Sequence, residues 1–522
     1  MNIFLKKILN IVKNKYFKLF FAGVISSLSF APTYYFILLY FSLPKLFAFL
    51  ANTKNQKQRA LAGFFFGLGH FFISFYWISA SLFIDISSYW YLLPFSLFLL
   101  PIFFSFVFIV PQSLLFTLYS HKADHKKIII FSCIWVVFEI FRSYLFYGFP
   151  WNLIGYSLIN NSYLLQIASY FGPYGMSLLV MISSLLPFLY VQKQISIVKL
   201  ILLELFLIIP FIIIGYLIIN YSALDNSPSL NVRIVQANIL QQQRWKNFYQ
   251  EKTFRKYIDL TLKNSNLRPD IIIWPESAND FILNDFRGMK FLGDILQPNQ
   301  LLITGIDRLS KENNKLILNN SLIVVNKEGE IVDFYDKMKL VPFGEFIPFK
   351  QYLPISKLTT GLIDYSPGKN LKILGFGKDN SKKFIPFICF EAIFPNNANI
   401  FTKKFDFLVN ITNDSWFGVS SGPYQHFAMT QVRAVEAGVP LIRVAVTGIS
   451  GLIDSFGEIV LKTEINEEIS LDFKIPQKKY TKNIYVVYGD LLIVIIMMML
   501  LLYGTLDYSS IIKWSRAILL KK

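Results

Sequence analysis

Three residue types that can combine in nucleophilic catalysis stand at the ends of apolar, strand-like runs. Cys389 closes FIPFIC, Glu276 closes IIIWPE, and Lys337 lies in YDKMKLVPFGEF. A cysteine at a strand end can present its sulfur at the edge of a sheet. A partly desolvated carboxylate can act as a base, and a lysine near a thiol favours the thiolate and can stabilise an oxyanion. The three residues therefore suggest thiol chemistry with a base and a cation beside it.

Each residue also has a plain structural interpretation. A free cysteine is often a small buried hydrophobe, and a glutamate or lysine near a strand end is usually solvated. We expect the apolar run before Glu276 to desolvate its carboxylate, raise its pKa and make it a usable base. Lys339 competes with Lys337 for the role of the cation, and Cys133 is expected only to pack among apolar residues. Taken singly, these residues do not decide between the two interpretations.

The runs that carry these residues belong to a stretch with the pattern of a mixed α/β domain. Seven β-rich apolar runs recur between residues 231 and 475, and helical patterns at 245–265 and 422–438 lie between some of them. Buried central strands with intervening helices are typical of a layered α/β sandwich. The strand-like runs are 232–238, 270–275, 301–306, 321–326, 384–390, 405–412 and 441–447.

The rest of the chain has the composition of a membrane protein. Of its 522 residues, 54% are hydrophobic and 16% are charged, whereas soluble domains are about 25% charged. The 53 Phe, 28 Tyr and 8 Trp exclude a disordered chain. A membrane helix needs about 20 largely apolar residues. We therefore expect an α-helical membrane bundle of about eight spans, at 16–31, 33–50, 62–83, 89–119, 128–147, 163–190, 198–220 and 485–504.

Charges between the expected spans predict how the chain lies in the membrane. Lysines and arginines precede the first span and recur after the second, fourth, sixth and last spans, but the loops 84–88 and 148–162 contain none. Basic loops stay in the cytoplasm. Both termini are therefore expected in the cytoplasm, with 1–220 as a membrane block, 231–475 as a domain on the outer face and 485–504 as a final membrane helix. The net charge of +18 is accordingly assigned to cytoplasmic loops, and no nucleic-acid partner is expected.

The motifs, taken in order, resemble those of the nitrilase (carbon–nitrogen hydrolase) superfamily. WPE, DK-x-x-LVPFGE, CFE and NDSWFG follow one another along the domain. The resemblance implies an αββα sandwich with Glu276 as general base, Lys337 as oxyanion stabiliser and Cys389 as nucleophile. It favours Lys337 over Lys339, because the family lysine lies three positions before LVPFGE. It also implies Glu345 as a second, supporting glutamate.

With membrane segments on both sides, nearly the whole chain resembles the apolipoprotein N-acyltransferase family. The signatures FEIFRSYLFYGFPWN, GYSL and GPYGMSLL lie within the membrane block. The resemblance implies supporting or substrate-binding roles for Glu391, Phe390, Trp245, Trp416 and Phe417. Phe390 departs from the family, which commonly has tyrosine there, so an aromatic wall remains but a hydroxyl is lost.

The resemblance implies a two-step acyl transfer at the bacterial cytoplasmic (inner) membrane, on its periplasmic face. Cys389 would take an acyl chain from a membrane phospholipid as a thioester. The α-amine of the diacylglyceryl-cysteine of an apolipoprotein would then accept the chain as an amide. The expected partners are therefore the phospholipid, the apolipoprotein and the lipid bilayer. No cofactor or metal is expected, because the chain has two cysteines, four histidines and no CxxC or HExxH motif.

Three other functions remain open at the level of the sequence. A membrane-tethered amidase would use the same residues with water as the acceptor, although a tether needs one span and about eight are expected. A transporter would be expected to show repeated halves, which the spans lack. A scaffold that had lost its activity would not need all three residue types.

Four polar residues have other expected roles. Glu139 and Arg142 lie three apart within an expected span, where ionisable groups are costly. We expect a mutual or interhelical structural pair, with contacts to lipid headgroups as the alternative. Glu204 lies in another span and has no evident partner. His426 is expected to pack near the site from a helix without joining the three reacting residues.

Overall fold

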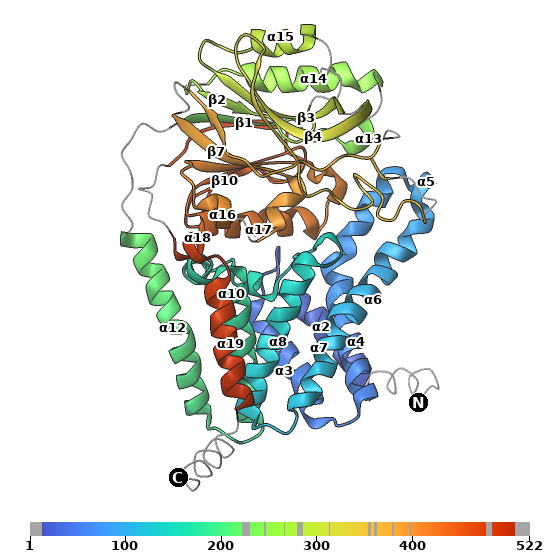
Figure 1. Ribbon diagram of the computed structural model, residues 1–522, viewed down its shortest axis with the longest axis vertical. Coiled ribbons are helices and arrows are strands. Elements are labelled where there is room, and N and C mark those ends of the chain that lie inside the picture. Colours follow the sequence, from blue (N-terminus) through green and yellow to red (C-terminus); the bar gives the residue numbers. More distant parts are fainter. Residues whose placement is uncertain are drawn as a thin grey trace, which may run out of the picture.

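The chain folds into two parts, which the computed structural model places end to end (Figure 1). Apolar helices form the lower part in this view, and an α/β domain forms the upper part. The structure describes residues 13–221, 230–244, 247–265, 267–278, 286–312, 314–352, 357–359, 363–377, 381–395, 398–476 and 483–506.

Among the residues that the structure describes, five helical passages are long and apolar enough to cross a membrane. Gln56–Leu92 holds α4 (Gln56–Phe75) and α5 (Ile86–Tyr89), and Phe95–Tyr119 holds α6 (Leu100–Phe104) and α7 (Val110–Leu115). The other three are Asp124–Tyr147 with α8 (Asp124–Tyr144), Ala168–Val191 with α10 (Ala168–Leu185) and α11 (Pro187–Val191), and Ile197–Tyr221, which is α12.

Helices also occupy the other three expected spans, but they are shorter. They are α2 (Lys15–Ser27), α3 (Leu39–Asn52) and α19 (Leu491–Thr505), the last preceded by α18 (Ile484–Tyr488). A further short helix, α9 (Ser162–Leu165), precedes α10. The prediction of apolar membrane helices is thus confirmed, whereas the count of eight spans stays a prediction.

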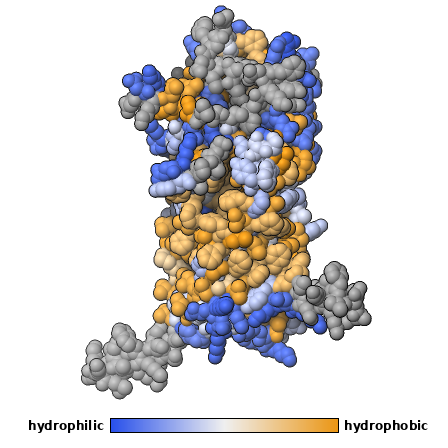
Figure 2. Space-filling view, turned by 90° about the vertical axis from the view of Figure 1, so that its right-hand side faces the viewer, coloured by the Kyte–Doolittle hydropathy of each residue, from blue (hydrophilic) through white to orange (hydrophobic). Residues whose placement is uncertain are grey.

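On the face shown in Figure 2, a broad belt of apolar side chains covers the membrane helices. Hydrophilic side chains border this belt at the end away from the α/β domain. α12 shows the cause most clearly, because only Leu200 and Gly215 of its 25 residues are buried. A continuous apolar surface of this kind is unusual in a soluble protein and is expected where helices face lipid.

Glycines allow α2 and α4 to approach closely. A Cβ on Gly69 would lie 2.0 Å from the carbonyl oxygen of Phe20, and a Cβ on Gly23 would lie 2.0 Å from that of Phe66. Small residues at such contacts are typical of membrane helices, whose association depends on close packing because lipid is as apolar as the side chains.

The α/β domain contains two six-stranded sheets. The first has the order β12–β1–β2–β3–β4–β5, and the second has the order β11–β10–β9–β8–β7–β6. In the first sheet the strands are β12 (Ile469–Lys474), β1 (Asn231–Gln236), β2 (Ile271–Ile273), β3 (Leu301–Glu312), β4 (Lys315–Val325) and β5 (Ile331–Asp336). In the second they are β11 (Ile459–Lys462), β10 (Gly451–Ile453), β9 (Leu441–Ala445), β8 (Phe407–Thr412), β7 (Lys382–Ile388) and β6 (Leu374–Phe376).

Helices cover the outer face of each sheet, which gives the αββα layering that the sequence predicted. α13 (Gln241–Arg244) leads into α14 (Asn247–Leu262), and α14 and α15 (Phe286–Asp294) lie over the first sheet. α16 (Ala398–Phe401) and α17 (Ser421–Ala437) lie between the second sheet and the membrane helices (Figure 1). The facing sides of the sheets are apolar and fully buried, as at Ile234, Val324 and Ile388. Each of the seven predicted strand runs overlaps an observed strand.

We predict that Gly69→Val destabilises the helix bundle. The added side chain would meet backbone atoms of α2, which cannot move aside as a side chain can, and overpacking typically costs about 1–3 kcal/mol. The midpoint of thermal unfolding in detergent should therefore fall. Gly504→Ala is the matched control, because its Cβ would meet mainly the side chain of Ile130. Equal midpoints for the two variants would contradict the prediction.

Candidate active site

Cys389 lies at the point where β7 ends and a short 3-10 helix, Cys389–Ile393, begins. Its φ angle is +50°, in the left-handed region that residues other than glycine rarely adopt. Such a conformation costs on the order of 1–3 kcal/mol and persists only where the surroundings impose it. Cys389 is 7% exposed. The sequence correctly placed this thiol at a strand end, and the turn directs it out of the ladder of β7.

The Glu276 carboxylate lies directly after β2 and accepts three hydrogen bonds. Oε1 accepts from Asn320 Nδ2 at 2.7 Å and from Lys337 Nζ at 3.1 Å, and Oε2 accepts from the backbone N–H of Asn413 at 2.7 Å. A Cβ on Gly305 would lie 2.6 Å from Glu276 Cα. The glycine in β3 therefore lets the turn that carries Glu276 pack against its neighbour.

Lys337 follows β5 and is held between two carboxylates. Its Nζ lies 3.1 Å from Glu276 Oε1 and 3.0 Å from Glu345 Oε1, and Lys337 is 1% exposed. Asn320 donates to both of these oxygens, since its Nδ2 is also 2.8 Å from Glu345 Oε1. Lys339, the alternative in the sequence, is exposed, and its Nζ stands over the ring of Phe394. The structure therefore brings Lys337, and not Lys339, to Glu276.

Our expectation of a raised pKa for Glu276 is wrong in its net direction. Burial does raise the pKa of the carboxyl, as the sequence suggested. However, the positive charge of Lys337 and hydrogen bonds from Asn320, Lys337 and Cys389 outweigh burial and lower the pKa below its ordinary value. The carboxylates also raise the pKa of Lys337 against the effect of its own burial. The pair is therefore charged at rest.

The thiol of Cys389 is neutral at rest. Burial raises its pKa, and the negative charge of Glu276 raises it further, whereas Lys337 and a hydrogen bond with Thr412 only partly oppose this rise. A thiolate is the reactive form of cysteine. Attack by Cys389 on a substrate therefore requires a base, and the ionised Glu276 carboxylate, which affects the pKa of the thiol, is the group available for that role.

Glu391 connects β5 and the residues that follow it, which include Lys337, to the turn that carries Cys389. Its Oε1 accepts from Tyr335 Oη at 2.7 Å and from the backbone N–H of Met338 at 2.7 Å. Its Oε2 accepts from the backbone N–H of Ile388 at 2.8 Å. The side chain itself is buried. This residue, expected to support the site, therefore links the two sheets beside the reacting groups.

The aromatic residues expected around the site lie where the domain meets the membrane helices. The ring of Phe390 is 6.1 Å from that of Phe149, and the ring of Phe417 is 4.6 Å from that of Trp77. Trp416 is half-buried beside Phe417. Trp245 lies outside the described residues.

Glu139 and Arg142 contact the backbone of the loop that follows α8 rather than one another. Arg142 Nη1 donates to the carbonyl oxygen of Trp151 at 2.7 Å, and Glu139 Oε1 accepts from the backbone N–H of Ile154 at 2.7 Å. The loop therefore receives a donor and an acceptor from one helix. Trp151, which it positions, is fully buried.

Several residues of the site were not singled out in the sequence. Arg443 is a polar residue within an apolar strand run, and Asn320 directly precedes one; that contrast was a signal that could have identified them. Asn413 and Asp414 belong to the NDSWFG motif, but only its two aromatic residues were predicted to take part in the site. Glu204, expected without a partner, accepts a hydrogen bond from Ser183 Oγ at 2.6 Å.

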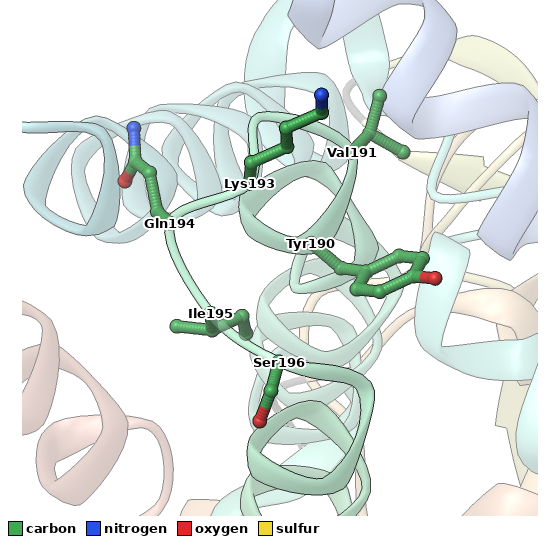
Figure 3. A pocket seen from close by; sticks show the side chains of 6 residues that line it. All are labelled: Tyr190, Val191, Lys193, Gln194, Ile195 and Ser196. Carbon is green, nitrogen blue, oxygen red and sulfur yellow. The ribbon is translucent and has the colours of Figure 1, made fainter.

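A hollow of ≈ 500 Å³ lies away from these residues (Figure 3). It is formed by the turn between α11 and α12, at the end of the membrane helices opposite the α/β domain (Figure 1). Its lining residues are Tyr190, Val191, Lys193, Gln194, Ile195 and Ser196. None of the residues gathered around Cys389 lines it, so it is no part of the candidate site.

Two family models match this chain, one in its membrane part and one in its α/β domain. The family model of the apolipoprotein N-acyltransferase N-terminal domain matches residues 22–186, and that of carbon-nitrogen hydrolase matches residues 231–478. Among solved structures, a nitrilase-superfamily amidase from Nesterenkonia is 13% identical, with a TM-score of 0.35, over 51% of this chain and 95% of that chain.

Two similar proteins match nearly the whole chain. An apolipoprotein N-acyltransferase from Rickettsia typhi is 36% identical over 475 residues, which are 90% of this chain and 94% of that protein. One from Brucella melitensis is 31% identical over 88% of this chain and 89% of that protein. The chain is therefore an acyltransferase, and it belongs to the apolipoprotein N-acyltransferase family.

Proposed function

We propose that this enzyme transfers an acyl chain from a membrane phospholipid to the α-amine of the diacylglyceryl-cysteine of an apolipoprotein. The acyl chain is carried between the two substrates as a thioester on Cys389. The observation that supports this most directly is the buried contact of a neutral thiol with an ionised glutamate and a protonated lysine.

In the first step, Glu276 takes the proton of the Cys389 thiol while the sulfur attacks an ester carbonyl of the phospholipid. The Lys337 ammonium stabilises the oxyanion that forms. Collapse of this intermediate breaks the ester C–O bond and forms the thioester. The proton on Glu276 passes to the departing alkoxide, so a lysophospholipid leaves and the Glu276 carboxylate is regenerated.

In the second step, the α-amine of the apolipoprotein attacks the thioester carbonyl. Glu276 accepts a proton from the amine, and Lys337 again stabilises the oxyanion. Breaking the C–S bond returns the thiolate, which takes the proton from Glu276. The product is an amide, and one base serves both steps.

Glu345 and Glu391 act as supporting residues in this proposal. Glu345 fixes the ammonium of Lys337 from the side opposite Glu276, and Asn320 joins the two carboxylates. Glu391 keeps the end of β5 beside the turn after β7. The aromatic side chains of Phe390, Trp416 and Phe417 supply apolar surface for a lipid substrate at the junction with the membrane helices.

We further propose the arrangement in the bacterial inner membrane that the basic loops predicted. The α/β domain, residues 231–475, lies on the periplasmic face, and both termini are cytoplasmic. Residues 1–220 and 485–504 supply about eight spans. This arrangement gives the site access to the leaflet in which both lipid-anchored substrates are held.

We predict that the full-length protein, incubated with phospholipid vesicles, gains one acyl group on Cys389. Cys389→Ala should carry no acyl group. Glu276→Gln and Lys337→Ala should form the adduct about 10²–10⁴-fold more slowly, because each removes one group that acts in the transition state. Mass spectrometry of the intact protein and its peptides measures the adduct and its position.

Cys133→Ala is the matched control, because that thiol is buried among the membrane helices. It should acylate as the wild type does. An acyl group on Cys389→Ala would disprove the proposed nucleophile. An adduct that only water removes, in the presence of a diacylglyceryl peptide, would instead identify a membrane-tethered hydrolase.

We predict that thioester formation is independent of pH across the neutral range. The base must be ionised, and the lowered pKa of Glu276 keeps it so until the pH falls below the ordinary glutamate value of about 4.3. The raised pKa of Lys337 keeps its charge above the ordinary value of about 10.4. Single-turnover acylation rates across a pH series measure this. A rise in rate centred between about pH 6 and 9 would point to a different base.

We predict opposite accessibility for two engineered cysteines in a background that lacks both native thiols, Cys133→Ala with Cys389→Ala. Glu328 and Lys199 are both exposed, the first in the α/β domain and the second in the first turn of α12. A membrane-impermeant maleimide should label Glu328→Cys in intact spheroplasts and Lys199→Cys only after permeabilisation. The reverse pattern would place the α/β domain in the cytoplasm and overturn the proposed orientation.

A further inference from the structure

His426 is buried next to the turn that carries the nucleophile, and the chemistry proposed above does not use it. It lies on α17, and its Nε2 is 3.2 Å from the carbonyl oxygen of Cys389. At the other side of the ring, Nδ1 is 3.0 Å from Asp414 Oδ1 and 3.0 Å from Arg443 Nη2. Arg443 Nη2 also donates to Asp414 Oδ2 at 2.7 Å.

Both charged partners of His426 are themselves fixed. Asp414 Oδ1 accepts from Thr412 Oγ1 at 2.9 Å, and a Cβ on Gly448 would lie 2.3 Å from Asp414 Oδ2, so the glycine leaves room for this carboxylate. Arg443 lies in β9, where its Nε donates to the carbonyl oxygen of Ile449 at 3.2 Å. The imidazole therefore stands against a rigid, fully buried ion pair.

These contacts select one form of the imidazole. A carbonyl oxygen only accepts hydrogen bonds, so Nε2 must carry the proton that faces Cys389. In the neutral ring Nδ1 is then bare and can accept from Arg443 Nη2. Burial and the positive charge of Arg443 lower the pKa of His426. Arg443 also opposes burial and holds the pKa of Asp414 at about 2. The lowered pKa favours the neutral ring, in which Nδ1 accepts from Arg443 Nη2 and the Asp414 carboxylate is held by Arg443 and Thr412 rather than by the imidazole.

We propose that His426 is a positioning residue for the nucleophile, whose Nε2–H holds the carbonyl group of Cys389 while Arg443, itself paired with Asp414, donates to Nδ1 and fixes the tautomer. The inference rests on the proposed role of Cys389 as the acyl carrier. It assigns His426 no proton transfer and no contact with substrate.

The hydrogen bond matters because the Cys389 backbone is in an unfavourable conformation. With φ at +50°, the turn needs an external contact to keep its shape. In a trans peptide the carbonyl and the following N–H point in opposite directions. Holding the carbonyl of Cys389 therefore also fixes the direction of the Phe390 N–H and the place of the sulfur relative to Glu276. A displacement of about 1 Å at a reacting group can cost 10²-fold in rate.

The experiment compares three substitutions of His426 in the full-length protein. His426→Leu removes the donor. His426→Gln places an amide N–H near the position of Nε2, and His426→Asn places one near Nδ1, out of reach of the Cys389 carbonyl. The measurements are the single-turnover rate of Cys389 acylation by vesicles of phosphatidylethanolamine and phosphatidylglycerol, and the lipid concentration that gives half of that rate.

We expect His426→Leu and His426→Asn to acylate about 10–10²-fold more slowly than the wild type, with half-saturation unchanged. His426→Gln should recover most of the rate and keep the wild-type dependence on pH, because His426 transfers no proton. Thr430→Val is the control, since Thr430 is buried on the same helix and its hydroxyl bonds only the carbonyl oxygen of Phe427.

Two results would overturn the inference. One is a wild-type rate in His426→Leu, and the other is an equal rate in His426→Gln and His426→Asn. The comparison of His426→Gln with His426→Asn remains informative even if His426→Leu does not fold. Both amide side chains are polar and no larger than imidazole, so both should fit the buried site. Cys389→Ala, measured in parallel, separates the two proposals: acylation of that variant would refute the proposed function whatever His426 does.

Discussion

The Lys337 ammonium, buried between two carboxylates, is the interaction on which the rest of the site depends. A cation that is 1% exposed needs close partners, and removing one partner from a buried ion pair typically costs about 3–5 kcal/mol. Glu276 comes from the end of β2, and Glu345 from the loop that follows Lys337. One charge therefore draws three separate segments to the same point at the edge of the first sheet. Asn320, in β4, completes this arrangement because it hydrogen-bonds both carboxylates and accepts from the backbone of Lys337.

The same cluster contributes to the neutral resting state of the thiol. Burial raises the pKa of Cys389 most, and the negative charge of Glu276 raises it further, whereas the Lys337 ammonium opposes this rise only in part. Sites that pair a cysteine with a positive group hold a thiolate at rest. Here the proton is expected to leave as the sulfur attacks, when the positive charge of Lys337 can stabilise the oxyanion rather than the sulfur. A neutral resting thiol is also less open to oxidation than a thiolate.

The sequence predicted the strands that have long apolar runs, and it missed the strands at the edges of the two sheets and the short inner strand β10. The seven predicted strand runs are central or neighbour central strands, where burial on both faces leaves a continuous apolar signal. β5, with the pattern IVDFYD, and the three-residue strands β6 and β10 carry no such signal, because neighbouring strands define them. In the site, the order of the motifs along the chain was enough to predict that Glu276, Lys337 and Cys389 lie together. The lowered pKa of Glu276 was not predictable from its own run, because Lys337 is 61 positions away in the chain.

The membrane helices contribute to the site more than an anchor would. Arg142 and Glu139 of α8 hold the backbone of the segment that carries Trp151. The Trp151 ring lies 5.6 Å from that of His426, and its Nε1 donates to Gln425 Oε1 at 2.7 Å, so the segment packs directly against α17. α17 in turn supplies the contact to the carbonyl of Cys389. Through these contacts the placement of two charged residues within a membrane helix is connected to the backbone of the nucleophile. A simple tether would leave that face of the domain to water, whereas here an aromatic layer from the membrane part covers it, and this argues that the two parts work as a single enzyme.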